Sequence, residues 1–196
     1  MNQLSILELA AIQQQKARQV LEQSGIASIW EKAGCRVQLI GSVRMGLLIN
    51  HRDIDLHVYS EHITEAHSFA IAAQMARIPE VKDLTCINGL HTDEHCMEWH
   101  LHYQYGEETW KFDIIHIEAD TLYDGYFEQM ADRIVELATP EQLETILRLK
   151  YETPETETII GAEYYEAVLT AGVTTLPELR AWLKERRQKE PYYWMP

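Results

Sequence analysis

Cysteine, basic side chains and long apolar runs are all scarce in this chain of 196 residues. Its three cysteines, Cys35, Cys86 and Cys96, lie far apart. An odd number at such spacing forms no disulfide framework, so a reducing compartment is the default. No stretch approaches the roughly 18 apolar residues that span a bilayer. The N-terminus lacks a basic segment followed by an apolar block. We therefore expect no signal peptide, no membrane segment and a cytoplasmic location.

Positive charge is also in short supply, with 17 Lys and Arg residues against 31 Asp and Glu residues and a net charge of −14. A diffuse, salt-dependent grip on nucleic acid needs a basic surface. The composition therefore predicts against extended nucleic acid as a partner, although it leaves the binding of a single nucleotide open. The length suits one domain, or a small domain with an appendage.

Apolar periodicity divides the chain at about residue 118. Before it, helical spacing alternates with two-residue spacing, and after it the spacing is helical throughout. Strands are expected over 36–40, 53–59, 81–87, 99–105 and 110–117, and helices over 5–23 and 26–33. Ser60 is the expected N-cap of a further helix. The expected fold class is α/β (α+β), a mixed sheet flanked by helices, with one domain over 1–118 and a helical region packed on it over 119–196.

Signals for helix ends support the helical part. Thr139 and Thr175 each begin a capping box with proline in the first turn. Gly172 is placed as a C-cap glycine, and a break is expected across 151–158.

One stretch has the residue types of a phosphate and metal site. A strand runs into the segment GSVRMG at 41–46, where a glycine lets the backbone approach a ligand and the Ser42 hydroxyl can hold phosphate oxygens. Asp53 and Asp55 are two residues apart on the next strand, so both carboxylates project from one face. Asp113 lies between apolar neighbours on a later strand. Such oxygen ligands suit Mg²⁺, and three of them suit a two-metal site. Without metal, converging carboxylates repel each other, which raises at least one pKa.

In order and spacing, this turn, the second glycine at 46, the Asp-x-Asp strand and the later lone Asp resemble the DNA polymerase beta-like nucleotidyltransferase superfamily. The resemblance covers residues 35–117. It implies transfer of a nucleoside monophosphate from an NTP, with ATP the expected donor, to a hydroxyl, using two Mg²⁺ ions and releasing pyrophosphate. Residue by residue, it implies that Gly41 and Ser42 bind the triphosphate and that Asp53 and Asp55 bind both metals. Asp113 would complete the catalytic metal site and help deprotonate the acceptor.

Two positions depart from that pattern. Met45 stands where many members carry an arginine, so Arg44 is the expected substitute, and Arg52 stands where many carry a serine. Arg44, Arg52 and Lys111 are the expected cations for the triphosphate. The net charge favours a small-molecule or protein acceptor. A catalytically silent nucleotide-binding or regulatory protein of the same fold is the alternative.

Histidines gather between residues 91 and 102. Matching the apolar sets of the predicted hairpin places His102 opposite Asp113 and His100 opposite residue 115. His100 and His102 are then expected on the site face as acceptor contacts, with His57 at its rim by strand alternation. A solvated outer face is an equal alternative. By residue type the stretch also permits zinc, although the spacing matches no standard finger. The candidate zinc ligands are His91, His95, Cys96, His100 and His102.

The helical part holds Arg148, Lys150, Tyr164 and Tyr165, to which the sequence assigns no role. The chain ends in three consecutive aromatic residues, 192–194. Packing of this apolar end on the domain is favoured over a partner contact or a homodimer.

Overall fold

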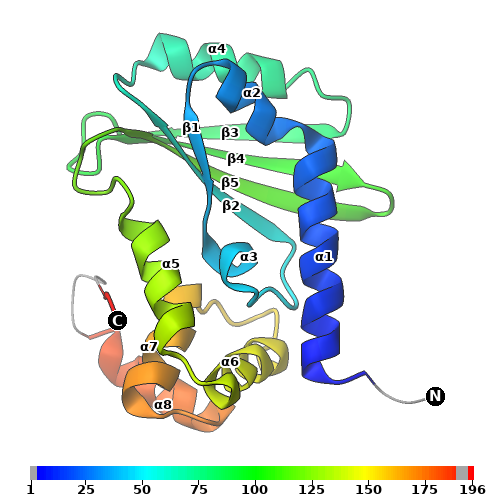
Figure 1. The fold of residues 1–196 in the computed structure, drawn as a ribbon, viewed down its shortest axis with the longest axis vertical. Coiled ribbons are helices and arrows are strands. Elements are labelled where there is room, and N and C mark those ends of the chain that lie inside the picture. The colour runs from blue at the N-terminus through cyan, green and yellow to red at the C-terminus, as the bar shows by residue number, and fades with distance from the viewer. Residues whose placement is uncertain (1–3, 189–193) are drawn as a thin grey trace.

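The computed structural model describes residues 4–188 and 194–196. Five strands and eight helices make up this part of the chain (Figure 1). In chain order they are α1 (Ile6–Ser24), α2 (Ile26–Lys32), β1 (Arg36–Leu39), α3 (Gly41–Met45), β2 (Asp53–Ser60), α4 (Glu65–Met75), β3 (Val81–Asn88), β4 (Cys96–Tyr105), β5 (Glu108–Glu118), α5 (Tyr126–Leu137), α6 (Pro140–Glu152), α7 (Gly161–Ala171) and α8 (Leu176–Arg186).

The strands form one mixed sheet in the order β1-β2-β5-β4-β3. β2 and β5 are parallel, and every other neighbouring pair is antiparallel. The parallel pair lies at the centre, where alternate residues of both strands point to the same face. The expected mixed sheet with flanking helices and a C-terminal helical segment is confirmed.

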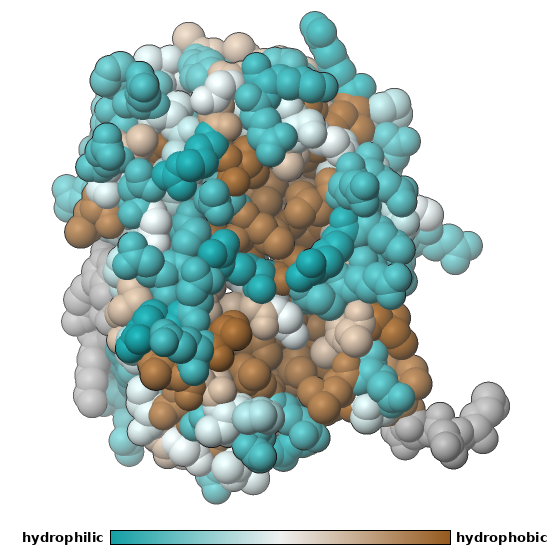
Figure 2. Space-filling model, in the orientation of Figure 1, coloured by the Kyte–Doolittle hydropathy of each residue, from teal (hydrophilic) through white to brown (hydrophobic). Residues whose placement is uncertain are grey.

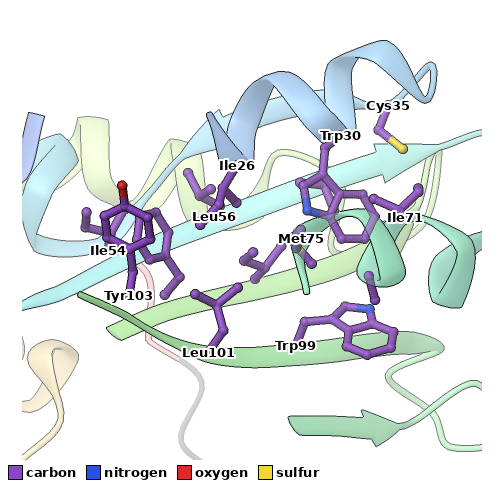
Figure 3. Close-up of a cluster of buried hydrophobic side chains, with 14 of the residues drawn as sticks. Ile26, Trp30, Cys35, Ile54, Leu56, Ile71, Met75, Trp99, Leu101 and Tyr103 are labelled. Carbon is purple, nitrogen blue, oxygen red and sulfur yellow. The ribbon is translucent and has the colours of Figure 1, made fainter. Parts of the chain in front are cut away.

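Helices α1, α2 and α4 cover one face of this sheet. Their apolar side chains meet those of the strands in the main core, which includes Trp30 of α2, Met75 of α4, Leu56 of β2 and Trp99 of β4 (Figure 3). The alternation Ile54-Leu56-Val58 on β2 points into this core, so the residues between them point to the opposite face.

The C-terminal helices form a second core below the sheet (Figure 1). Ala10 of α1 and the α3–β2 loop residues Leu47 and Ile49 join it, so α1 contributes to both cores. Trp194, the described member of the aromatic end, packs partly buried against this second core; residues 192 and 193 lie outside the described residues. The division at residue 118 stays a prediction.

Several helix ends match the sequence signals. Capping boxes are present at Thr139 and Thr175, and Gly172 ends α7 with φ +63°. The Ser60 prediction is wrong: β2 continues through Ser60, and the Thr64 side chain accepts the His67 N–H as the N-cap of α4. Among the described residues, no helix combines the length and apolarity needed to cross a membrane.

The predicted hairpin register is wrong by two residues. Tyr105 pairs with Glu108 across the short turn at Gly106, so Tyr103 lies opposite Trp110 and His100 lies opposite Asp113. A shift of two keeps every side chain on its expected face, because the period of a strand is two. The histidines therefore stay on the face opposite the main core.

Candidate functional site

The three aspartates singled out by their pattern line one cavity of about 570 Å³. Asp55 of β2 pairs directly with Asp113 of β5, and Asp53 pairs with Lys111. The opposite walls come from the C-terminal helices and from the loop before α7. Members of this lining include Gly41, Ser42, Asp53, Asp55, Lys111, Asp113, Phe127, Lys150, Tyr164 and Tyr165. Hydrophilic side chains surround recessed apolar ones on the face shown in Figure 2.

Gly41 is fitted against one of the carboxylates. Its φ is +64°, and a Cβ placed on it would lie 2.0 Å from Asp55 Oδ2. Any other residue would both strain the backbone and displace the carboxylate. The glycine of the turn and the second aspartate of the strand are therefore one packed unit, although 14 positions separate them.

Burial and mutual repulsion perturb the two β2 carboxyls. The pKa of Asp55 is raised to about 7, first by burial and then by the charges of Asp113 and Asp53. The pKa of Asp53 is also raised, mainly by burial. The expectation that convergence raises at least one pKa is confirmed. A bound cation would relieve this repulsion, and the donors are the hard oxygens that Mg²⁺ prefers. The residues present therefore fit a magnesium site.

Asp113 is held by two basic side chains. Lys111 Nζ donates to its Oδ2 at 2.8 Å, and His100 Nδ1 lies 2.5 Å from its Oδ1. The other ring nitrogen of His100 is 3.3 Å from Glu98 Oε2. His100 thus bridges a cavity carboxylate and a second carboxylate outside that cavity.

Lys150 of α6 is a buried cation in the same cavity, with a relative exposure of 7%. Its Nζ donates to the Leu47 carbonyl at 2.7 Å and lies 5.7 Å from the centre of the Tyr165 ring. Burial lowers its pKa to about 8, while the charges of Asp55 and Asp53 act in the opposite direction. The sequence pattern assigns no role to this lysine, because its contact with Leu47 joins positions about a hundred residues apart. A charged residue among the apolar positions of the capped helix over 140–152 was the available signal.

Two predicted triphosphate cations lie elsewhere. Arg44 donates from Nε and Nη2 to Asp132 of α5, both at 2.9 Å, and Arg52 Nη2 lies 3.4 Å from Glu108. Neither lines the aspartate cavity, whereas Lys111 does. Arg44 instead ties α3 to α5, and its role toward a nucleotide stays a prediction.

Two predicted rim histidines also lie outside the cavity. His102 bonds Asp83 at 2.8 Å. His57 is buried under Phe127 of α5, with ring centres 5.1 Å apart, and opens to a second cavity. Burial lowers its pKa to about 4. The structure brings His100, and not His57 or His102, to the aspartates.

The zinc ligands that the residue types permitted are dispersed. Each histidine faces a different carboxylate. His91 faces Glu65 and His95 faces Glu118, while His100 faces Asp113 and His102 faces Asp83. These pairings direct the four imidazoles to carboxylates rather than to Cys96. The spacing of the histidines could not predict these pairs, because each carboxylate partner lies elsewhere in the sequence and is brought close by the fold.

Comparison with known proteins places the fold. No family model matches the sequence, and neither does any curated protein. Among solved structures, Cid1, described for its RNA terminal uridylyl transferase activity, matches with 17% identity over 80% of this chain and 46% of that chain, at a TM-score of 0.53. The GLD-2/RNP-8 complex matches with 9% identity over 95% and 68%, at 0.57. Cid1 poly(U) polymerase with MgGTP bound matches with 16% identity over 80% and 49%, at 0.55.

The chain shares its fold with these Cid1 and GLD-2/RNP-8 structures, in keeping with the resemblance drawn from its motifs. The chain spans about half the length of the Cid1 structures it matches. One expectation is overturned by these likenesses. The prediction against extended nucleic acid is wrong, because RNA is the substrate named for Cid1, a protein of the same fold. A net charge sums the whole surface, whereas an RNA end needs only a local set of contacts.

Proposed function

We propose that this protein is a Mg²⁺-dependent nucleotidyltransferase that moves a nucleoside monophosphate from an NTP to an acceptor hydroxyl. The observation that carries the proposal is the shared cavity of Asp53, Asp55 and Asp113, into which the Gly41 turn is fitted without space for a Cβ. The fold comparison supports the same chemistry. Most of the acceleration would come from positioning and electrostatic stabilisation of the in-line transition state.

Asp53, Asp55 and Asp113 would hold two Mg²⁺ ions. When bound, these ions neutralise the triphosphate and lower the pKa of the acceptor hydroxyl. The acceptor oxygen then bonds to the α-phosphorus, the bond from that phosphorus to the bridging oxygen breaks, and pyrophosphate leaves. Asp113 would receive the acceptor proton.

Lys111 would change partners during this cycle. Its ammonium pairs with Asp113 at 2.8 Å, and metal binding at Asp113 competes with that contact. Phosphate oxygens in the cavity offer the displaced ammonium a new anion. His100 would keep Asp113 oriented from the other oxygen.

Lys150 would supply the second cation for the triphosphate. It is buried in the cavity and ordered by the Leu47 carbonyl, so little side-chain entropy is lost on contact with phosphate. Through Lys150 the C-terminal helices would take part in nucleotide binding as well as in stability.

A transfer assay tests the proposal. Each NTP, ATP first, is incubated with Mg²⁺ and three kinds of acceptor: an RNA with a free 3′-hydroxyl, a panel of small hydroxyl compounds, and protein. Pyrophosphate release and the mass gain of the acceptor are measured. RNA enters first, because the named activity of Cid1 is on RNA ends, and a 3′-blocked RNA is its control.

The variants Asp53→Asn and Asp113→Asn distinguish an active nucleotidyltransferase from a catalytically silent nucleotide-binding protein. Both are expected to lower transfer by about a hundred- to a thousandfold, the size seen when one electrostatic group of an active site is removed. Asp83→Asn is the matched control, because Asp83 lies on β3 and pairs with His102 outside the cavity. NTP binding without pyrophosphate release, unchanged by either cavity variant, would favour the regulatory protein.

A further inference from the structure

A second cavity of about 340 Å³ lies beside the first and is walled from it by Phe127, which lines both. Its apolar lining comes from Ile115, Ile117, Tyr123 and Phe127, and its polar lining from His57, Glu94, Cys96 and Glu98. The proposed nucleotidyl transfer uses none of these four polar side chains directly.

Glu94, Cys96 and Glu98 already have the proximity of a ligand set. One carboxylate oxygen of each glutamate and the Cys96 Sγ all lie within 4.8 Å of one another. Cys96 is buried, Glu98 half-buried and Glu94 exposed, which leaves an entry path from solvent on the Glu94 side. A thiolate with two carboxylates differs from the all-oxygen aspartate site and suits zinc and similar ions better than Mg²⁺.

His57 adds an independent feature to this cavity. Its exposed fraction is 3%, and only its Nδ1 has a hydrogen-bond partner among the described residues, the Tyr59 hydroxyl at 3.3 Å. That hydroxyl donates its own hydrogen to Glu128 Oε1 at 2.7 Å, so it must accept from Nδ1–H. The lone pair is therefore on Nε2, for which the described part of the chain supplies no hydrogen-bond donor. A histidine whose other nitrogen is fixed in this way is the usual arrangement at a metal.

We propose that Glu94, Cys96 and Glu98 bind one divalent transition-metal ion, zinc by ligand type, in the cavity that His57 also lines. Uptake forms a metal–sulfur bond and releases the Cys96 thiol proton to solvent. The site is separate from the proposed magnesium site. It adjoins that site through His100, which lies between Glu98 and Asp113.

Cobalt substitution tests the site directly on the full chain. Metal-free protein is titrated with Co²⁺, and the near-ultraviolet sulfur-to-cobalt charge-transfer band reports a thiolate ligand; Zn²⁺ competition then gives affinity and stoichiometry. We expect one equivalent of Zn²⁺ to remove the band. The band is expected in wild type, Cys86→Ser and Asp113→Asn, and lost in Cys96→Ser. Cys86 is the matched control, because it is a free thiol on the neighbouring strand β3.

Two further variants keep the proposal falsifiable if Cys96→Ser does not fold, which circular dichroism would reveal. Glu98→Gln and His57→Ala are each expected to weaken Zn²⁺ binding by about 10- to 100-fold, the effect typical of groups that support a metal. No uptake by the wild type, or a band that survives Cys96→Ser, would overturn the site. Unchanged affinity in both Glu98→Gln and His57→Ala would overturn it as well.

Discussion

Replacing Gly41 with alanine would test whether the turn and the Asp55 carboxylate form one unit. Two effects are expected. An alanine at φ +64° has left-handed backbone strain of about 1–2 kcal/mol. For a chain of this size that lowers the melting temperature by roughly 2–8 °C. The new Cβ would also lie 2.0 Å from Asp55 Oδ2, so the carboxylate must move. A displacement of about 1 Å at a reacting centre lowers activity by about a hundredfold.

Gly46→Ala is the matched control for this substitution. Gly46 has φ +75°, in the same conformational region, but nothing lies within 4 Å of the position of its Cβ. Both variants should therefore lose stability in thermal unfolding, Gly41→Ala more than Gly46→Ala because its Cβ also displaces Asp55, while only Gly41→Ala loses Mg²⁺-dependent pyrophosphate release. Equal activity in the two variants, with both folded, would refute the proposed fit between Gly41 and Asp55.

Three other substitutions follow from the same site. Asp55→Asn should raise the melting temperature of Mg²⁺-free protein at pH 8 and change it little at pH 4: with a folded pKa of about 7 against an ordinary 3.8, stability falls as pH rises from about 4 to about 7. An equal gain at both pH values would contradict that linkage. Lys150→Met should raise KM for the NTP about tenfold or more with the fold intact in circular dichroism; a change in kcat alone would argue against a triphosphate contact. His100→Ala should lower kcat about tenfold with KM for the NTP unchanged, and His100→Gln should restore part of it, whereas a purely structural role would appear only in the unfolding curve.

The strand pattern predicted most of the sheet, because polar and apolar side chains alternate over 53–58 of β2 and 110–114 of β5, and the apolar ones enter the main core. It missed the register of the β4–β5 hairpin, since the apolar sets match at either of two offsets. The short turn at Gly106 selects the offset, and its length is not visible in the pattern. At Ser60 a long-range contact overrides a local signal. β2 stays paired with β5 through Ser60, so the helix N-cap lies further on, at Thr64.

For the site, the motif residues were predictable and their cationic partners were not. Asp55 and Asp113 pair directly across β2 and β5, and Gly41 packs against Asp55, so the motif residues meet in the fold. The direction of a long basic side chain depends on which carboxylate is near in space. Arg44 pairs with Asp132, from an element 88 positions further along the chain. Lys150 reaches the cavity because α6 packs against the α3–β2 loop. In that loop the Asn50 side-chain amide donates to the Lys150 carbonyl.

Covalent transfer measured on wild-type protein and Asp113→Asn side by side tests the central claim most directly. With an α-labelled NTP, Mg²⁺ and the acceptor panel, the wild type is predicted to attach the labelled nucleoside monophosphate to a hydroxyl acceptor and release one pyrophosphate per transfer. Asp113→Asn is predicted to bind the NTP and to transfer the nucleoside monophosphate about a hundred- to a thousandfold more slowly. Label transfer of equal extent in both proteins, or none from any NTP to any acceptor by the folded wild type, would contradict the account.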